Sequence, residues 1–305
     1  MLHPIYLPFS EEQLRNHFVE INNTENNIDK HINKFKKSIA NYSLFETNPI
    51  QINDIRLARQ IEKDETFWTA SSLMTIFYSE NRDREITELL KLTFGEVPPL
   101  KKFNTWNECI NGDLKLFFEP NIPSPKEYLR WISENMQTKQ IIPYIIEKAS
   151  RSSYSNAFRL DLEGPTNVDA LLLNEDNGFA VFFEAKVLSD ISYQTSYDTI
   201  RNQLIRNVDV MLNDNKELHY PLNKRLAEDT LFALLTPKVF KDNYNARLYG
   251  YKFMDYKKTP TLIADDLPHR YLNQTQCENI VNRMGWLTWE NLKEINYDCC
   301  KWIKN

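Results

Sequence analysis

The spacing of apolar residues predicts a mainly helical region over residues 1–130. Apolar positions recur every three or four residues, the period of an amphipathic helix, over 10–21, 26–45 and 54–78. Ser10 stands where a helix N-cap is expected. Within the same region, "DLKLFFEP" (113–120) predicts a short strand, and a proline-rich loop follows before a helix that begins near Ser124.

After residue 130 the pattern changes to the order helix, three strands, helix, strand. The predicted helices cover 139–150 and 194–212, and the predicted strands cover 155–163, 167–174, 178–187 and 231–237. A helix that joins two buried strands is typical of a crossover in an α/β fold, so we expect a mixed central sheet flanked by helices. A helix near "TWENLKEINYDCCKWIKN" predicts a C-terminal helical extension of this domain, which we place at 131–305.

Composition indicates a soluble globular protein. The chain has 305 residues, 42% hydrophobic and 26% charged, with no apolar run near the roughly 18 residues of a spanning helix and no signal-peptide pattern. We therefore expect a cytoplasmic protein that does not bind a membrane. The four cysteines include no C-x-x-C, the five histidines show no metal-binding spacing, and no G-x-S-x-G or phosphate-binding glycine loop is present. Zinc sites, serine hydrolases and nucleotide-binding loops are disfavoured.

Three charged residues lie in runs that otherwise belong in a protein interior. Asp169 opens the run 170–173, and Glu184 and Lys186 close the run 179–183. "EDNG" between the runs predicts a hairpin. A loop at Asp176–Asn177 places Asp169 opposite Glu184, and a loop at Asn177–Gly178 places it opposite Lys186. In both registers the three side chains share one face, with cross-strand neighbours about 5 Å apart.

A divalent cation would relieve the repulsion between these two carboxylates. Oxygen ligands favour Mg²⁺, with Mn²⁺ as a substitute, and the candidate ligands are Asp169, Glu184 and the carbonyl of Ala185. Lys186 would place a water or stabilise charge on a phosphate. The chemistry indicated is hydrolysis of a phosphodiester by a metal-activated water. The alternative is a buried ion pair without catalysis, although two acids and one base leave a negative excess.

Asp169, a fifteen-residue gap and then Glu184-Ala185-Lys186 at the end of an apolar strand resemble the PD-(D/E)xK nuclease superfamily. Val168 stands where the family commonly has proline. The resemblance covers residues 137–236 and implies a restriction-endonuclease-like core with Asp169, Glu184 and Lys186 as catalytic residues. A competing Asp113-Leu114-Lys115 lies at the start of its run and has no upstream carboxylate, so we interpret it as a strand entrance.

The resemblance also implies roles for polar residues on the flanking helices. Family members often add a metal-binding Glu from the helix before the first core strand, and Glu147, twenty-two residues before Asp169, fits that position. Gln203 and Arg206, on the helix after Lys186, would contact phosphate or support the lysine. The other interpretation of all three is an ordinary solvated helix surface.

The expected substrate is DNA, while RNA and a second copy of the chain remain open as partners. Residues 238–258 carry six Lys or Arg against two Asp, a net charge of +4 in a chain of net charge −5. Tyrosines interleave with these cations, a composition suited to phosphate contacts and base stacking, or equally to packing on the core. The predicted nucleic-acid contacts in this stretch are Lys238, Lys241, Arg247 and Lys252. A catalytically inactive protein of the same fold, binding nucleic acid or a protein, is the alternative function.

Overall fold

The computed structural model describes residues 9–18, 28–35, 63–139, 142–144, 146–147, 164–191, 201–214, 216 and 218–303. The predicted strand 155–163 lies outside these residues, as do half of the predicted helix 139–150 and the first part of the predicted helix 194–212.

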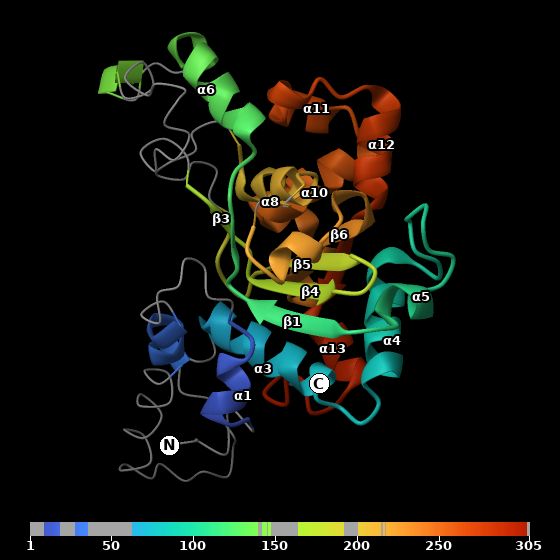
Figure 1. Ribbon diagram of the computed structural model, residues 1–305. Helices are drawn as coiled ribbons and strands as arrows, with labels where there is room; N and C mark the ends of the chain where they lie inside the picture. Colours follow the sequence, from blue (N-terminus) through green and yellow to red (C-terminus); the bar gives the residue numbers. More distant parts are fainter. Residues whose placement is uncertain are drawn as a thin grey trace.

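A mixed five-stranded sheet forms the centre of the molecule, as expected for an α/β protein (Figure 1). Its strand order is β1-β4-β5-β6-β7, with β1, β4 and β5 antiparallel and β5, β6 and β7 parallel. The strands are β1 (Leu114–Phe118), β4 (Ala170–Asn174), β5 (Ala180–Ala185), β6 (Thr230–Thr236) and β7 (Met284–Thr288). A separate two-stranded sheet pairs β2 (Asn121–Ile122) with β3 (Thr166–Asn167).

Helices cover both faces of the sheet and connect its parallel strands. The helices before β5 are α1 (Glu11–Arg15), α3 (Glu65–Phe77), α4 (Arg82–Phe94), α5 (Trp106–Ile110) and α6 (Lys126–Lys139), and residues 28–35 are also helical. Those after β5 are α8 (Gln203–Met211), α9 (Lys238–Asp242), α10 (Leu248–Lys258), α11 (Leu262–Asp266), α12 (Gln274–Asn282) and α13 (Trp289–Ile295). Among the described residues, no helix is both long and apolar enough to cross a membrane.

Two hydrophobic clusters lie on opposite faces of the sheet because successive strand side chains point to opposite sides. Phe183 and Ala185 of β5 pack with residues of α3, α4 and α13, whereas Phe182 packs with residues of α8, α10 and α12. Figure 1 shows α3, α4 and α13 on one side of the strands and α8 and α10 on the other. Glu184 and Lys186 are in the same alternation as Phe182, so both belong to the α8 and α10 face.

The two regions predicted to be separate share this sheet and one of its cores. β1, from the N-terminal region, pairs with β4 along its length, from Leu114↔Asn174 to Phe118↔Ala170. The cluster on the α3 face likewise joins Leu14 and Phe67 to Ala170 and Leu292. Residue 130 therefore lies within a single folded unit.

Glycine permits one very close helix-strand approach. A Cβ atom at Gly285 of β7 would lie 2.5 Å from Thr93 Cγ2 and 2.6 Å from Phe94 Cε1, at the end of α4. These distances are shorter than real Cβ contacts, so only glycine allows α4 to lie this near the strand. The apolar pattern of the sequence did not predict β7, which is short and contains this glycine.

Arg225 holds the C-terminal end of α8 and is only 1% exposed. Its guanidinium donates to the carbonyls of Met211 (2.7 Å) and Val210 (3.3 Å) in the last turn of the helix, and to the carbonyl of Asn213 just after it. Burial lowers the pKa of Arg225 to about 9. The side chain thus fixes the helix whose inner face reaches the candidate site.

Arg225→Met is expected to lower the free energy of unfolding by about 2–4 kcal/mol, because it removes the buried hydrogen bonds to the Met211 carbonyl and to Thr230 Oγ1. Urea denaturation measures the change. Lys224→Met, at the exposed neighbouring position, is the control and is expected to leave the midpoint unchanged. Equal midpoints for the two variants would show that the buried guanidinium does not stabilise α8.

Candidate active site

Asp169 and Glu184 lie opposite each other at the ends of β4 and β5. The strands pair Ala170 with Phe183, so the next pair outward is Asp169 with Glu184. This is the first of the two predicted registers. The connection is a four-residue loop, Glu175–Gly178, rather than a two-residue turn, and Gly178 adopts a positive φ of 80° within it.

The two carboxylates are placed at the cost of desolvation and mutual repulsion. Glu184 is fully buried, and Asp169 Oδ2 accepts a hydrogen bond of 2.7 Å from the amide of Ala185. Burial, followed by the charge of Glu184, raises the pKa of Asp169 well above its usual range. A positive charge beside this pair would be stabilising.

Lys186 supplies one such charge. Its ammonium donates to Glu184 Oε1 at 2.6 Å and to the carbonyl of Ala185 at 3.0 Å, and the residue is 5% exposed. Burial alone would lower its pKa, but the charges of Glu184, Asp169 and Glu65 outweigh burial and raise the pKa. The lysine is therefore charged at neutral pH. Its backbone is held by the carbonyl of Leu235 and the indole of Trp289.

Glu65, the first residue of α3, brings a third carboxylate that the sequence analysis missed. Its Oε2 accepts from the amide of Val187 at 2.9 Å and from Ser189 Oγ at 2.5 Å, while Oε1 lies 3.9 Å from Lys186 Nζ. The one sequence signal was an acid directly after Asp64, which caps the helix. Acids are common in a first helical turn, so that signal alone does not indicate a site.

Asn207 completes the set from α8. Its Nδ2 donates to Glu184 Oε2 at 2.7 Å and to the carbonyl of Gln203 at 3.1 Å. Its Oδ1 is buried and has no hydrogen-bond partner among the described residues. Because the amide nitrogen is fixed by a carboxylate, the amide oxygen is left as an acceptor beside Glu184.

The other predicted helix residues are placed less close to the cluster. Gln203 is half-buried at the start of α8 and contacts Asn207 through its backbone carbonyl. Arg206 is almost buried on the same helix and donates to the carbonyl of Gly164 at 3.5 Å. Glu147 is exposed, and its predicted approach to the carboxylates remains a prediction.

The donor set fits a hard divalent cation in charge and atom type. Asp169, Glu184 and Glu65 set three carboxylates against one ammonium, and the Asn207 oxygen accepts no hydrogen bond from any described residue. Over the described ranges, no three His, Cys, Asp or Glu side chains are grouped closely enough to bind a metal. Lys186 already contacts Glu184 Oε1 and the Ala185 carbonyl, so a cation would share these oxygens with the lysine.

The cations of the basic stretch 238–258 contact partners within the chain. Lys238 pairs with Asp242, Lys252 with Asp266, Lys241 donates to the carbonyl of Trp286, and the Arg247 guanidinium lies over the ring of Phe240. Tyr249 and Tyr256 are fully buried. Core packing therefore accounts for these two tyrosines, whereas Tyr251 is exposed, and nucleic-acid binding by the four cations remains a prediction.

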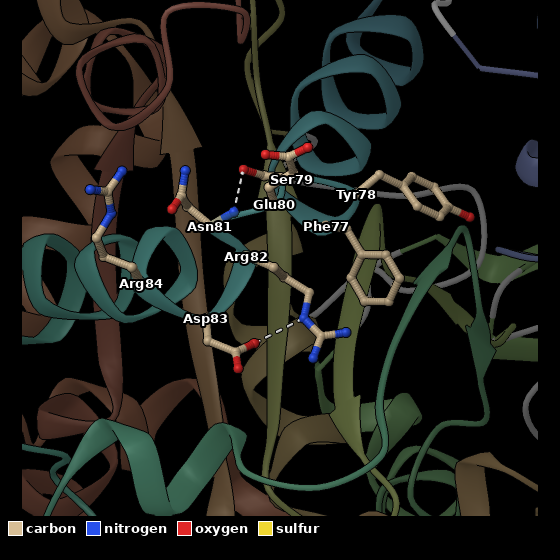
Figure 2. Close-up of a pocket in the computed structure, with 8 residues that line it drawn as sticks. All are labelled: Phe77, Tyr78, Ser79, Glu80, Asn81, Arg82, Asp83 and Arg84. Atoms are coloured by element: carbon tan, nitrogen blue, oxygen red, sulfur yellow. Dashed lines mark hydrogen bonds and ion pairs between the residues drawn. The ribbon is translucent and has the colours of Figure 1, made fainter.

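A surface hollow lies where α3 passes into α4 (Figure 2). It is lined by residues 77–84, and its Arg82 pairs with Asp83 at 2.9 Å. The hollow begins at Phe77, the last residue of α3, whereas Glu65 is the first. Twelve helical residues separate the two ends by about 18 Å, so the hollow belongs to a different part of the surface.

Comparison of the chain with protein-family models, curated proteins and solved structures gives no match.

Proposed function

We propose that this protein is a divalent-metal-dependent nuclease that hydrolyses phosphodiester bonds of DNA. The observation that carries the proposal is the cluster of Asp169, Glu184, Glu65 and Lys186, in which buried Glu184 and Lys186 and half-buried Asp169 and Glu65 set three carboxylates against one ammonium. Buried carboxylates in excess are costly for a folded protein, and such costs persist mainly at functional sites.

The resemblance to PD-(D/E)xK nucleases gives these residues coherent roles. In that family a Glu often comes from the helix before the first core strand. If β1 is taken as that strand, Glu65 of α3 precedes it and already contacts the loop after β5. We therefore assign to Glu65 the role predicted for Glu147, and we propose a restriction-endonuclease-like core built from β1, β4, β5, α8 and β6.

Each side chain has a distinct task in the proposed reaction. Asp169 and Glu184, with the Ala185 carbonyl, would hold Mg²⁺, which supplies an activated water and offsets charge at phosphorus when bound. Lys186 carries its proton throughout and donates it as a hydrogen bond to charge that develops on the phosphate. Asn207 fixes Glu184 through its amide nitrogen and leaves its oxygen as an acceptor for a water.

A non-catalytic protein of the same fold remains the second candidate. The observation that favours it is the 2.6 Å pair between Lys186 and Glu184, in which the lysine partly supplies the charge that a metal would bring. Titration of Mn²⁺ while recording the melting temperature separates the two, since only a folded state that binds the ion is stabilised. A rise in the wild type that is absent in Asp169→Asn supports the nuclease. No rise in either protein supports the second candidate.

Glu65→Gln is expected to weaken Mn²⁺ binding by at least about tenfold, because loss of a metal-binding carboxylate should cost no less than loss of a partner that orients the ligands. The amide oxygen of glutamine can still accept from Val187, so the fold is expected to persist. Calorimetric titration measures the affinity. Glu147→Gln is the matched control, and a loss of affinity confined to that variant would return the role to Glu147.

A further inference from the structure

Glu119, the residue directly after β1, has a backbone conformation that its side chain disfavours. Its φ is 48°, in the left-handed region that suits glycine, yet the residue is a buried glutamate with 7% exposure. Strained non-glycine residues persist where the surroundings hold them in place. The contacts of Glu119 show which segments of the chain hold it in this conformation.

The backbone of Glu119 contacts the strand that carries Asp169. The amide of Glu119 donates to the Asp169 carbonyl at 3.1 Å, and the amide of Val168 donates to the Pro120 carbonyl at 3.2 Å. The two segments therefore run side by side where the main sheet passes into the β2-β3 sheet. A shift of Glu119 would move the backbone that sets the position of the Asp169 carboxylate.

The side chain of Glu119 joins two helices to the same point. Its Oε2 lies 2.7 Å from Lys34 Nζ and 2.7 Å from His31 Nδ1, both in the 28–35 helix, and its Oε1 accepts from Thr66 of α3 at 3.4 Å. Burial raises the pKa of Glu119, but His31 and Lys34 outweigh burial and bring the pKa down to about 2. The carboxylate is therefore ionised when it binds them.

The segment around His17 makes further contacts between the N-terminal helices and β1. The amide of Phe118 donates to the His17 carbonyl at 2.7 Å, and His17 Nδ1 lies 2.7 Å from the Leu116 carbonyl, so this segment covers the outer edge of β1. The ring of Phe18 stacks on His31 with centroids 5.1 Å apart. The N-terminal residues and the end of β1 thus form one packed layer next to the candidate site.

We propose that Glu119 is a positioning residue of the active site. Its backbone amide fixes the position of the Asp169 backbone, and its carboxylate fixes the position of the first turn of α3. Glu119 therefore determines the distance between Asp169 and Glu65. Through the same carboxylate, the N-terminal helices become part of the catalytic unit. The inference rests on the proposed function in that Asp169 and Glu65 are taken to act together on one cation.

The test is Glu119→Gln in the full chain, with calorimetric Mn²⁺ titration and amide hydrogen exchange. The expected results are about tenfold weaker Mn²⁺ binding, and faster exchange both in residues 28–35 and at the Ala185 amide, which donates its hydrogen bond to Asp169 Oδ2. Glu96→Gln removes a carboxylate from an exposed ion pair with Lys91 and is the matched control. Lys34→Gln, which keeps the Glu119 carboxylate, is expected to give a smaller change in the same direction and serves if Glu119→Gln fails to fold.

The two readouts separate this inference from the proposed function. If the wild type binds no Mn²⁺, the proposed function is wrong, and exchange at the Ala185 amide still decides whether Glu119 positions Asp169. If Glu119→Gln melts earlier but keeps the wild-type Mn²⁺ affinity and Ala185 exchange, Glu119 only stabilises the fold and the inference is overturned. If Glu119→Gln does not fold and Lys34→Gln keeps the wild-type Mn²⁺ affinity and Ala185 exchange, the inference is overturned as well.

Discussion

Lys186→Ala is expected to lower the free energy of unfolding by about 3–5 kcal/mol in EDTA and to abolish phosphodiester cleavage. Within the part of the chain that the structure describes, the ammonium is the one cation paired with Glu184, and its charge also attracts Asp169 and Glu65. Its removal leaves the fully buried Glu184 carboxylate and the half-buried Asp169 and Glu65 carboxylates without this positive charge. Cleavage is lost because the charge that develops on the phosphate no longer meets a positioned donor.

The stability of Lys186→Ala should depend on metal far more than that of the wild type. A divalent cation brings the positive charge that the variant lacks, so Mn²⁺ is expected to restore much of its melting temperature while cleavage stays absent. Lys186→Arg should also fail to cleave, because a planar guanidinium does not replace a compact ammonium at 2.6 Å from Glu184. Lys115→Ala removes an exposed lysine paired with Asp113 and is the control. A Lys186→Ala protein that melts and cleaves like the wild type would contradict both roles of the lysine.

Asp169→Asn is expected to stabilise the metal-free protein while it removes activity. The folded state raises the pKa of Asp169 through burial and through Glu184. When folding raises the pKa of an acid, its ionisation destabilises the folded state. This destabilisation grows as the pH rises above the pKa that the acid has in the unfolded chain, here 3.8. Asparagine has no charge to desolvate and can still accept from the Ala185 amide, so a gain on the order of 1–2 kcal/mol is expected at pH 8.

Melting temperatures in EDTA between pH 4 and pH 8 measure this effect. The difference between Asp169→Asn and the wild type should be small at pH 4 and should grow towards pH 8, and added Mn²⁺ should stabilise the wild type alone. Asp83→Asn, at a largely exposed carboxylate, is the control and should give no such trend. A wild type that is more stable than Asp169→Asn at pH 8 in EDTA would contradict the repulsion between Asp169 and Glu184.

The central hairpin could be predicted from the sequence because its determinants are local. The apolar runs beside Asp169 and Glu184 define two buried strands, and the turn residues between them limit the pairing to two registers. The observed pairing of Ala170 with Phe183 agrees with one of these. Residues two apart share a face, so the common location of Glu184 and Lys186 also followed from the sequence.

Glu65 could not be predicted because its role depends on tertiary packing. It precedes Glu184 by 119 positions in the chain, and locally it is one more acid in a first helical turn. The packing of α3 against the sheet brings its carboxylate to Val187 and Ser189. The same applies to β1, whose pattern predicted a strand but not its place beside β4.

In the basic stretch 238–258, the charge of the sequence alone does not predict which cations are available to bind a phosphate. Lys241 and Lys257 donate to the backbone carbonyls of Trp286 and Met284, both in β7. Because that strand was not predicted, neither were these partners. Burial accordingly lowers the pKa of Lys257 to about 8. A cation that is held by the backbone has less freedom to bind a phosphate.

Cleavage of plasmid DNA, single-stranded DNA and RNA by the wild type, Asp169→Asn and Lys186→Ala, with Mg²⁺ or EDTA, tests the central claim most directly. The account predicts that the wild type cleaves DNA in Mg²⁺, that EDTA stops the reaction, and that both variants are inactive although Asp169→Asn is folded. Absence of cleavage by the wild type on every substrate, or undiminished cleavage by both variants, would contradict it.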